Sequence, residues 1–143
     1  MNETEVAREG IPPPTRKHLV VFVDDDAAVL SALRRLLRGE PYEFLCMEDP
    51  EAALEIVRTR DVSLFIADFR MPAMSGTGLL QLVKSASPKT VRVLLTGYPR
   101  ATWVVQAQER ELMQLVYGKP WDNEELKRAI LKWLHAREQS DEG

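Results

Sequence analysis

Five short apolar runs divide the sequence, and a segment with helical spacing of apolar residues follows each of them. The runs are HLVVFV, YEFLCM, VSLFIAD, TVRVLLTG and LMQLVYG, at residues 18–23, 42–47, 62–68, 90–97 and 112–118. Continuous apolar runs are typical of strands that are covered on both faces of a sheet. This alternation constrains the fold more than any other feature, because strands that alternate with helices build a parallel sheet.

The segments between the runs have the start and stop signals of helices. We expect helices at residues 27–39, 49–60, 75–87, 100–110 and 122–138, the fourth being the weakest. Asp26 and Asp49 precede two of them and are expected to be N-caps, and Gly39 is a plausible C-terminal stop. The buried stripes of the first and last helices are expected at Val29, Leu33, Leu36 and Leu37, and at Leu126, Ile130, Trp133 and Leu134.

Crossover connections between parallel strands are right-handed, so consecutive helices can cover both faces of the sheet. The sequence therefore predicts one α/β domain. Residues 1–17 are polar and contain three consecutive prolines at 12–14, which is typical of an extended, flexible tail. We place the folded domain at residues 18–137 and a short C-terminal tail at 138–143.

Composition narrows the classes of function. The 143 residues have a net charge of −3, which gives no electrostatic reason to expect nucleic acid or an anionic membrane as a partner. Cys46 is the only cysteine, so an intrachain disulfide and a thiol–metal cluster are excluded, and we interpret it as a small core residue. No apolar stretch approaches the about 20 residues that span a bilayer, so we expect a cytoplasmic location.

Charged and polar side chains stand at the carboxyl ends of four predicted strands. Asp24 and Asp25 follow the first strand, Asp68 ends the third, Thr96 ends the fourth and Lys119 follows the fifth. The carboxyl ends of parallel strands share one edge of the sheet, and ligands of such sheets bind there. Three carboxylates and one ammonium at one place indicate a hard divalent cation, and Mg²⁺ prefers such oxygen ligands.

These residues and the motifs around them resemble the response-regulator receiver domains of two-component signalling. The resemblance covers about residues 18–137 and is carried by the paired acids Asp24 and Asp25, by Asp68 in ADFRMPAMSG, by Thr96 in LLTG and by Lys119 in GKPW. It implies a flavodoxin-like, CheY-like fold, in which a five-stranded parallel sheet of order 2-1-3-4-5 has helices on both faces.

The resemblance also implies a role for each matched position. Asp68 is expected to be the phosphoacceptor and, with Asp25, a direct Mg²⁺ ligand, whereas Asp24 would act mostly through water. The backbone carbonyl of Arg70 would be a further ligand. Lys119 would pair with the phosphoryl group, and its bond to the following proline is expected to be cis. Thr96 completes the matched set.

In this interpretation the chain is a phosphorylation-switched protein-binding module and not a turnover enzyme beyond its own dephosphorylation. Its expected partners are a histidine kinase or phosphotransfer protein upstream and an unknown protein downstream. Receivers commonly signal, and can dimerise, through the fourth helix, fifth strand and fifth helix. Val116 stands where many receivers have an aromatic switch residue, and Tyr117 lies one step on, on the opposite face of a strand.

Other hypotheses remain open at this point. The chain could be a receiver fragment of a longer regulator, or a degenerate receiver that only binds. Haloacid-dehalogenase-like phosphatases also combine an Asp nucleophile with Mg²⁺, and Asp24 and Asp26 fit the first half of their Asp-x-Asp signature, but Ala28 does not fit the second half. His18 and His135 lie at the edges of predicted elements, and we expect both on the surface.

Overall fold

The computed structural model describes residues 10–68 and 75–142 of the chain. In chain order its elements are β1 (Leu19–Val23), α2 (Ala27–Leu36), β2 (Glu43–Met47), α3 (Pro50–Thr59), β3 (Leu64–Asp68), α4 (Gly76–Ala86), β4 (Val91–Thr96), α5 (Thr102–Glu109), β5 (Leu115–Gly118) and α6 (Asn123–Glu142). The strands form one sheet of order β2-β1-β3-β4-β5, and every pair is parallel. The predicted fold is therefore confirmed.

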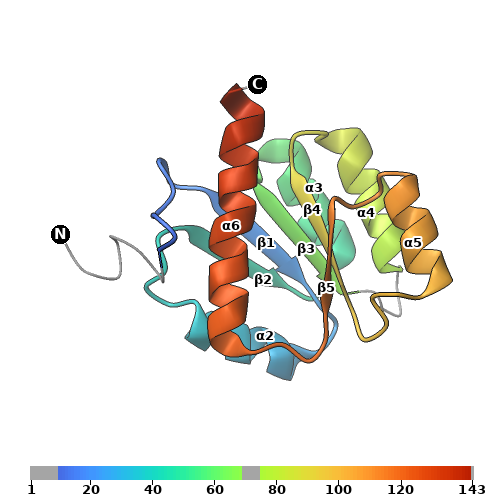
Figure 1. The fold of residues 1–143 in the computed structure, drawn as a ribbon, viewed down its shortest axis with the longest axis horizontal. Coiled ribbons are helices and arrows are strands. Elements are labelled where there is room, and N and C mark those ends of the chain that lie inside the picture. The colour runs from blue at the N-terminus through green and yellow to red at the C-terminus, as the bar shows by residue number, and fades with distance from the viewer. Residues whose placement is uncertain (1–9, 69–74, 143) are drawn as a thin grey trace.

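Helices cover both faces of this sheet (Figure 1). Apolar side chains of α3, α4 and α5 pack on one face, and those of α2 and α6 pack on the other. The inner strands β1, β3 and β4 are buried along their whole length, which explains their continuous apolar sequences. The order of the strands reverses between β1 and β3, and this switch point is where open α/β sheets bind ligands.

The helix starts agree with the predicted caps. Asp26 accepts hydrogen bonds from the backbone N–H groups of Ala28 and Val29 and so caps α2. Asp49 caps α3 in the same way, with Pro50 in its first turn. These caps satisfy backbone donors that have no partner inside the helix. No helix among residues 10–68 and 75–142 is both long and apolar enough to cross a membrane.

The fifth strand is shorter than its apolar run, because β5 begins only at Leu115. The buried side chain of Arg92 accounts for this difference. Its guanidinium donates to the backbone carbonyls of Glu111 and Leu112, and its own N–H donates to the side chain of Gln114. These groups hold the segment before Leu115 in a loop, with Glu111 at a φ of 59°, instead of in the strand ladder.

The two ends of the domain also differ from the sequence expectation. Helix α6 continues to Glu142, five residues beyond the expected domain end at residue 137. The segment before β1 contacts this extension: Thr15 donates to Glu138, and the carbonyl of Pro12 lies 2.8 Å from a ring nitrogen of His135. Residues 10–17 are thus held against α6 at several points.

Candidate functional site

The register of the sheet brings the predicted site residues together. Val23 pairs with Ala67, so the following residues, Asp24 and Asp68, lie side by side at the switch point. Thr96 pairs with Gly118 at the ends of β4 and β5, and the N–H of Lys119 donates to the carbonyl of Thr96 over 2.9 Å. Residues 24, 68, 96 and 119 therefore meet at the carboxyl edge of the sheet, although 95 positions separate the first from the last.

Three carboxylates form the centre of this site. One oxygen each of Asp24, Asp25 and Asp68 lies within 4.8 Å of the others. Asp24 and Asp68 are buried, with 2% and 5% of their surface exposed, whereas Asp25 is exposed. Lys119 supplies the opposing charge, and its Nζ lies 2.5 Å from Oδ1 of Asp68. The site therefore combines a solvent-facing acid, two buried acids and one ammonium.

Asp24 has unused capacity to bind a ligand. Its Oδ1 accepts a hydrogen bond from the N–H of Asp26, but no donor among the described residues bonds to its buried Oδ2, from which the Nζ of Lys119 lies 4.0 Å. Burial raises the pKa of the Asp24 carboxyl to about 6, and repulsion from Asp68 adds to this. A buried carboxylate oxygen without a donor fits a divalent cation, which would neutralise the repulsion.

The third acid of the run is not part of this cluster. The side chain of Asp26 accepts from the first turn of α2, as expected for an N-cap. This separates its role from those of Asp24 and Asp25, which precede it directly. The backbone carbonyl of Arg70, predicted as a further metal ligand, lies outside the described residues.

Thr96 and Lys119 are held by the backbone around them. Thr96 is buried, and its hydroxyl accepts the N–H of Tyr98 over 3.0 Å, which orders the turn after β4. The bond between Lys119 and Pro120 is cis, as the resemblance predicted. The loops after β4 and β5 thus fix two polar side chains beside the acids.

An apolar hollow of about 440 Å³ lies beside Lys119, lined by Val29, Lys119, Pro120 and Trp121. The ring of Trp121 also contacts Phe22 of β1 edge-on, with 6.3 Å between the ring centroids. Sequence analysis did not assign Trp121 to the site. Its position two residues after Lys119 in GKPW was the signal that could have placed it there.

The neighbouring residues Val116 and Tyr117 occupy opposite faces of β5, as alternation in a strand requires. Val116 packs against the cluster formed with α3, α4 and α5, whereas Tyr117 packs against the cluster formed with α2 and α6. The ring of Tyr117 meets that of Trp133 at an interplanar angle of 86°. Tyr117 therefore does not take the place of an aromatic residue at position 116.

The burial of the two histidines and of the cysteine can be compared with the positions expected from the sequence. His18 is 1% exposed, so its predicted surface position was wrong. Its two ring nitrogens lie within hydrogen-bond distance of Ser63 and Glu138, which compensates for its burial. His135 is partly exposed. Cys46 is partly buried, and burial raises the pKa of its thiol to about 11, which keeps it in the poorly nucleophilic thiol form.

Comparison with known protein families decides the class of this site. The family described as response regulator receiver domain matches residues 20–131. The chain belongs to this family. The match includes all five residues that converge at the carboxyl edge of the sheet, so the receiver fold and the receiver motifs coincide in one place.

Individual relatives agree with this assignment. The hydrogenase transcriptional regulatory protein HoxA of Bradyrhizobium diazoefficiens is 30% identical over 107 residues, which are 75% of this chain and 22% of that protein. The chain thus spans about a fifth of the length of this relative. The crystal structure of the signal receiver domain of an HD domain-containing protein from Pseudomonas fluorescens Pf-5 is 31% identical, with a TM-score of 0.80, and covers 90% of this chain and 94% of that chain.

A more distant structure supports the fold. The receiver domain of the sensor histidine kinase PA1611 from Pseudomonas aeruginosa PAO1 is 18% identical, with a TM-score of 0.71, and covers 84% of this chain and 99% of that chain. That structure has a magnesium ion coordinated in its active-site cleft. Magnesium binding is a general feature of the receiver family.

Proposed function

We propose that this receiver domain accepts a phosphoryl group on Asp68 from a histidine kinase or a phosphotransfer protein, with Mg²⁺ held by Asp24, Asp25 and Asp68. The observation that carries the proposal is the set of three carboxylates beside Lys119, in which the buried Oδ2 of Asp24 has no hydrogen-bond donor among the described residues. Such a set is incomplete without a cation. It also contains a nucleophile and an ammonium that are already in contact.

The transfer requires little covalent chemistry from the protein. A carboxylate oxygen of Asp68 attacks phosphorus, the bond from phosphorus to the donor's histidine nitrogen breaks, and the imidazole keeps the electron pair and takes up a proton. Lys119 orients the Asp68 carboxylate before transfer and pairs with a phosphoryl oxygen afterwards. A Mg²⁺ ion held by Asp24, Asp25 and Asp68 would supply further positive charge to the phosphoryl group.

The hollow beside Lys119 supports docking of a donor protein close to Asp68. Its lining by Val29, Pro120 and Trp121 is apolar and adjoins the charged site. An apolar side chain of the donor could bury surface there while its phosphohistidine faces Asp68. The downstream signal would then leave by another surface, which we place at α5, β5 and α6.

The proposed output surface joins aromatic and charged side chains. A hollow of about 380 Å³ lies between β5 and α6, lined by residues that include Tyr117, Arg128, Lys132 and Trp133. Because the N–H of Lys119 bonds to the carbonyl of Thr96, a movement of Lys119 toward a phosphoryl group would pull on the ends of both β4 and β5. We propose that this shift changes homodimer formation or the affinity for a downstream protein.

The alternatives receive less support. A haloacid-dehalogenase-like mechanism would use Asp26 as its acid, but this side chain is engaged in capping α2. A degenerate receiver would lack part of the acid and lysine set, which this chain has. The hypothesis of a longer regulator has more support, because the relative HoxA is a transcriptional regulatory protein of which this chain matches about a fifth. In that case the same switch would act on an attached output domain.

The test is phosphoryl transfer from acetyl phosphate, followed by intact-protein mass spectrometry. We expect one phosphoryl group per chain with Mg²⁺ present and none with excess EDTA. The Asp68→Asn variant should not be labelled, because the amide is not a nucleophile. Asp26→Asn is the matched control, since asparagine also caps helices and the residue lies outside the cluster.

Equal labelling of Asp68→Asn and the wild type would contradict the assignment of the acceptor. Labelling that continues in EDTA would contradict the role of the metal. Near-ultraviolet circular dichroism of each variant distinguishes a lost acceptor from a lost fold, because the three tryptophans report on packing.

A further inference from the structure

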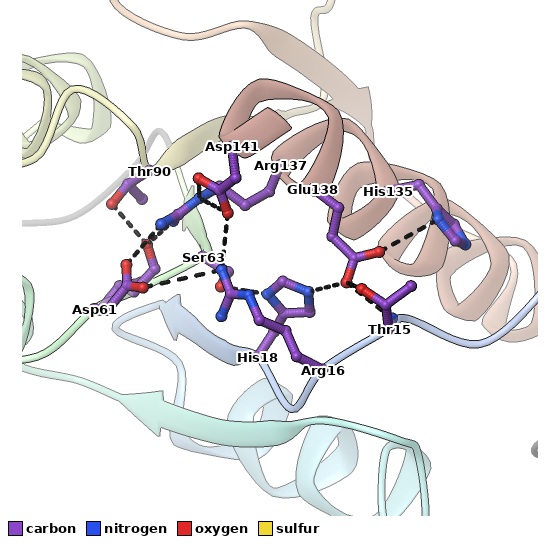
Figure 2. A network of polar contacts seen from close by, with 11 residues as sticks. Thr15, Arg16, His18, Asp61, Ser63, Thr90, His135, Arg137, Glu138 and Asp141 are labelled. Carbon is purple, nitrogen blue, oxygen red and sulfur yellow. Dashed lines mark hydrogen bonds and ion pairs between the residues drawn. The ribbon is translucent and has the colours of Figure 1, made fainter. Parts of the chain in front are cut away.

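A second cluster of polar and charged groups lies at the opposite, amino-terminal end of the sheet (Figure 2). It joins the segment before β1, the segment before β3 and the last turns of α6. We call it the polar clasp, and it consists of Thr15, Arg16, His18, Asp61, Ser63, Arg137, Glu138 and Asp141. Positions that are up to 125 residues apart in the sequence are bonded here.

His18 lies at the centre of the polar clasp, between Ser63 and Glu138 (Figure 2). Its Nδ1 is 2.6 Å from the hydroxyl of Ser63, and its Nε2 is 2.8 Å from Oε2 of Glu138. A carboxylate cannot donate, so the neutral ring with hydrogen on Nε2 satisfies all three groups: Ser63 donates to Nδ1, and Nε2 donates to Glu138. Both His18 and Ser63 are buried.

Glu138 joins the segment before β1 to α6. Its Oε2 accepts the N–H of Thr15 over 2.9 Å and the hydroxyl of Thr15 over 2.8 Å, in addition to the bond from His18. Burial alone would raise the pKa of Glu138, but the hydrogen bonds from His18 and Thr15 outweigh it and hold this pKa below its usual value. One ionised carboxylate oxygen is therefore shared by three donors.

The other charges around His18 include two cations. Arg16 bonds to Asp141, and Arg137 bonds to Asp61, to Asp141 and to the buried carbonyl of Val62. His135 faces the other oxygen of Glu138 at 3.7 Å. The nearby carboxylates of Asp61 and Asp141 are thus bonded to guanidinium groups, and among the described residues Glu138 is the one carboxylate that is hydrogen-bonded to the ring of His18.

We propose that the polar clasp is an acid-sensitive latch, in which protonation of His18 releases residues 10–17 from the end of α6. In the closed form, a proton added to Nδ1 makes this nitrogen a donor to the hydroxyl oxygen of Ser63. The hydroxyl hydrogen of Ser63 then loses Nδ1, which is its one acceptor among the described residues. The imidazolium would also be buried near Arg16 and Arg137. Opening the latch gives the charged ring access to water.

The balance of these effects has a clear direction. Burial lowers the pKa of His18 below 6.5, and the hydrogen bond that the ring donates to Glu138 offsets this only in part. In the open form the ring is solvated and its pKa lies near the usual value of about 6.5. Between pH 7.5 and pH 5.5 the ratio of the open to the closed form should therefore rise. The upper limit of this rise is about tenfold, and it is reached if the closed form does not bind the proton at all.

Amide hydrogen exchange followed by NMR tests this latch in the wild-type chain. We expect protection of the Thr15 amide, which donates to Glu138, to fall up to about tenfold between pH 7.5 and pH 5.5 after correction for intrinsic exchange. The amides of Val21 and Ile66 in the inner strands should keep their protection. The ring signals of His18 should titrate below pH 6.5, in step with the loss at Thr15.

The chain has two histidines, which gives a matched pair of variants. His18→Gln should remove the pH response of Thr15, and His135→Gln should keep it. A response that is lost in His135→Gln and kept in His18→Gln would overturn the proposal, as would unchanged Thr15 protection in the wild type. If His18→Gln does not fold, titration of the His18 ring signals in the wild type provides the test. Full protonation of His18 while the Thr15 amide is still protected would contradict the latch.

Discussion

The two charged clusters at opposite ends of the sheet differ in how completely their side chains are bonded. At the carboxyl end, the acids at 24, 25 and 68 meet with one ammonium nearby, and the Oδ2 of Asp24 has no hydrogen-bond donor among the described residues. At the amino end, the carboxylate of Glu138 has three donors, and the guanidinium of Arg137 has three acceptor groups. Acids with unused capacity indicate a binding site, whereas acids with complete bonding indicate a structural one.

This comparison predicts opposite effects when one charged residue is removed from each cluster. In the polar clasp, Arg137→Met removes the guanidinium that donates to the buried carbonyl of Val62 and to the carboxylates of Asp61 and Asp141. Thr90 still donates to Val62 and Arg16 still donates to Asp141, whereas Asp61 loses its nearest cation. We expect the free energy of unfolding, measured by urea denaturation, to fall by about 3 kcal/mol.

The matched control for Arg137 is an exposed ion pair. Arg60 lies 2.8 Å from Glu43, but both side chains are more than 40% exposed. Arg60→Met should therefore change the free energy of unfolding by less than about 1 kcal/mol. Equal losses in the two variants would show that burial does not distinguish the clasp from an ordinary surface pair.

In the acidic site, Asp24→Asn should stabilise the metal-free domain. The pKa of Asp24 is raised to about 6 from 3.8, so the folded state binds a proton more tightly than the unfolded chain does. Ionisation of Asp24 therefore destabilises the fold above pH 6, and this cost disappears below pH 3.8. At pH 7.5 in EDTA we expect a gain on the order of 1–3 kcal/mol in the free energy of unfolding.

Urea denaturation at two pH values and with Mg²⁺ checks this prediction. The gain in Asp24→Asn should vanish near pH 3.5, and saturating Mg²⁺ should reverse the order, because only the wild type then binds the ion well. Asp26→Asn should show neither effect. A loss of stability in Asp24→Asn in EDTA would place Asp24 among the fully bonded acids and remove the contrast.

The raised pKa of Asp24 also predicts a pH dependence of metal binding. A protonated carboxyl is a poor ligand, so protons compete with Mg²⁺ below about pH 6. Between pH 7.5 and pH 5.0 the affinity should fall about tenfold, as one competing proton requires. Isothermal titration calorimetry measures this, and a constant affinity across that range would show that Asp24 is not a ligand.

The carboxyl end of the sheet was predictable from sequence because its signals are local. Each site residue directly ends or follows an apolar run, and parallel strands bring those ends to one edge. The resemblance then supplied the strand order and the cis bond at Lys119, both of which the structure contains. Continuous apolar sequence located the inner strands well, since they are covered on both faces.

The amino end was not predictable for the opposite reason. Arg137, Glu138 and Asp141 look like the solvated end of a helix, and no local pattern shows that they also have partners 75 to 125 residues away. His18 looked like a surface residue because hydropathy does not record Ser63 and Glu138 on either side of its ring. The apolar run 112–118 was too long a prediction for β5, because Arg92 draws the preceding carbonyls out of the ladder.

Paramagnetic relaxation with Mn²⁺, which takes oxygen ligands as Mg²⁺ does, tests the contrast most directly because both acidic clusters are present in one molecule. In ¹⁵N-labelled wild-type protein at pH 7.5, low Mn²⁺ should broaden the amide signals of Asp24, Asp25 and Thr96. The signals of Thr15, Glu138 and Asp141 should stay sharp, and excess Mg²⁺ should restore the broadened ones. Broadening around Asp61 and Asp141 with Asp24 unaffected would contradict the account.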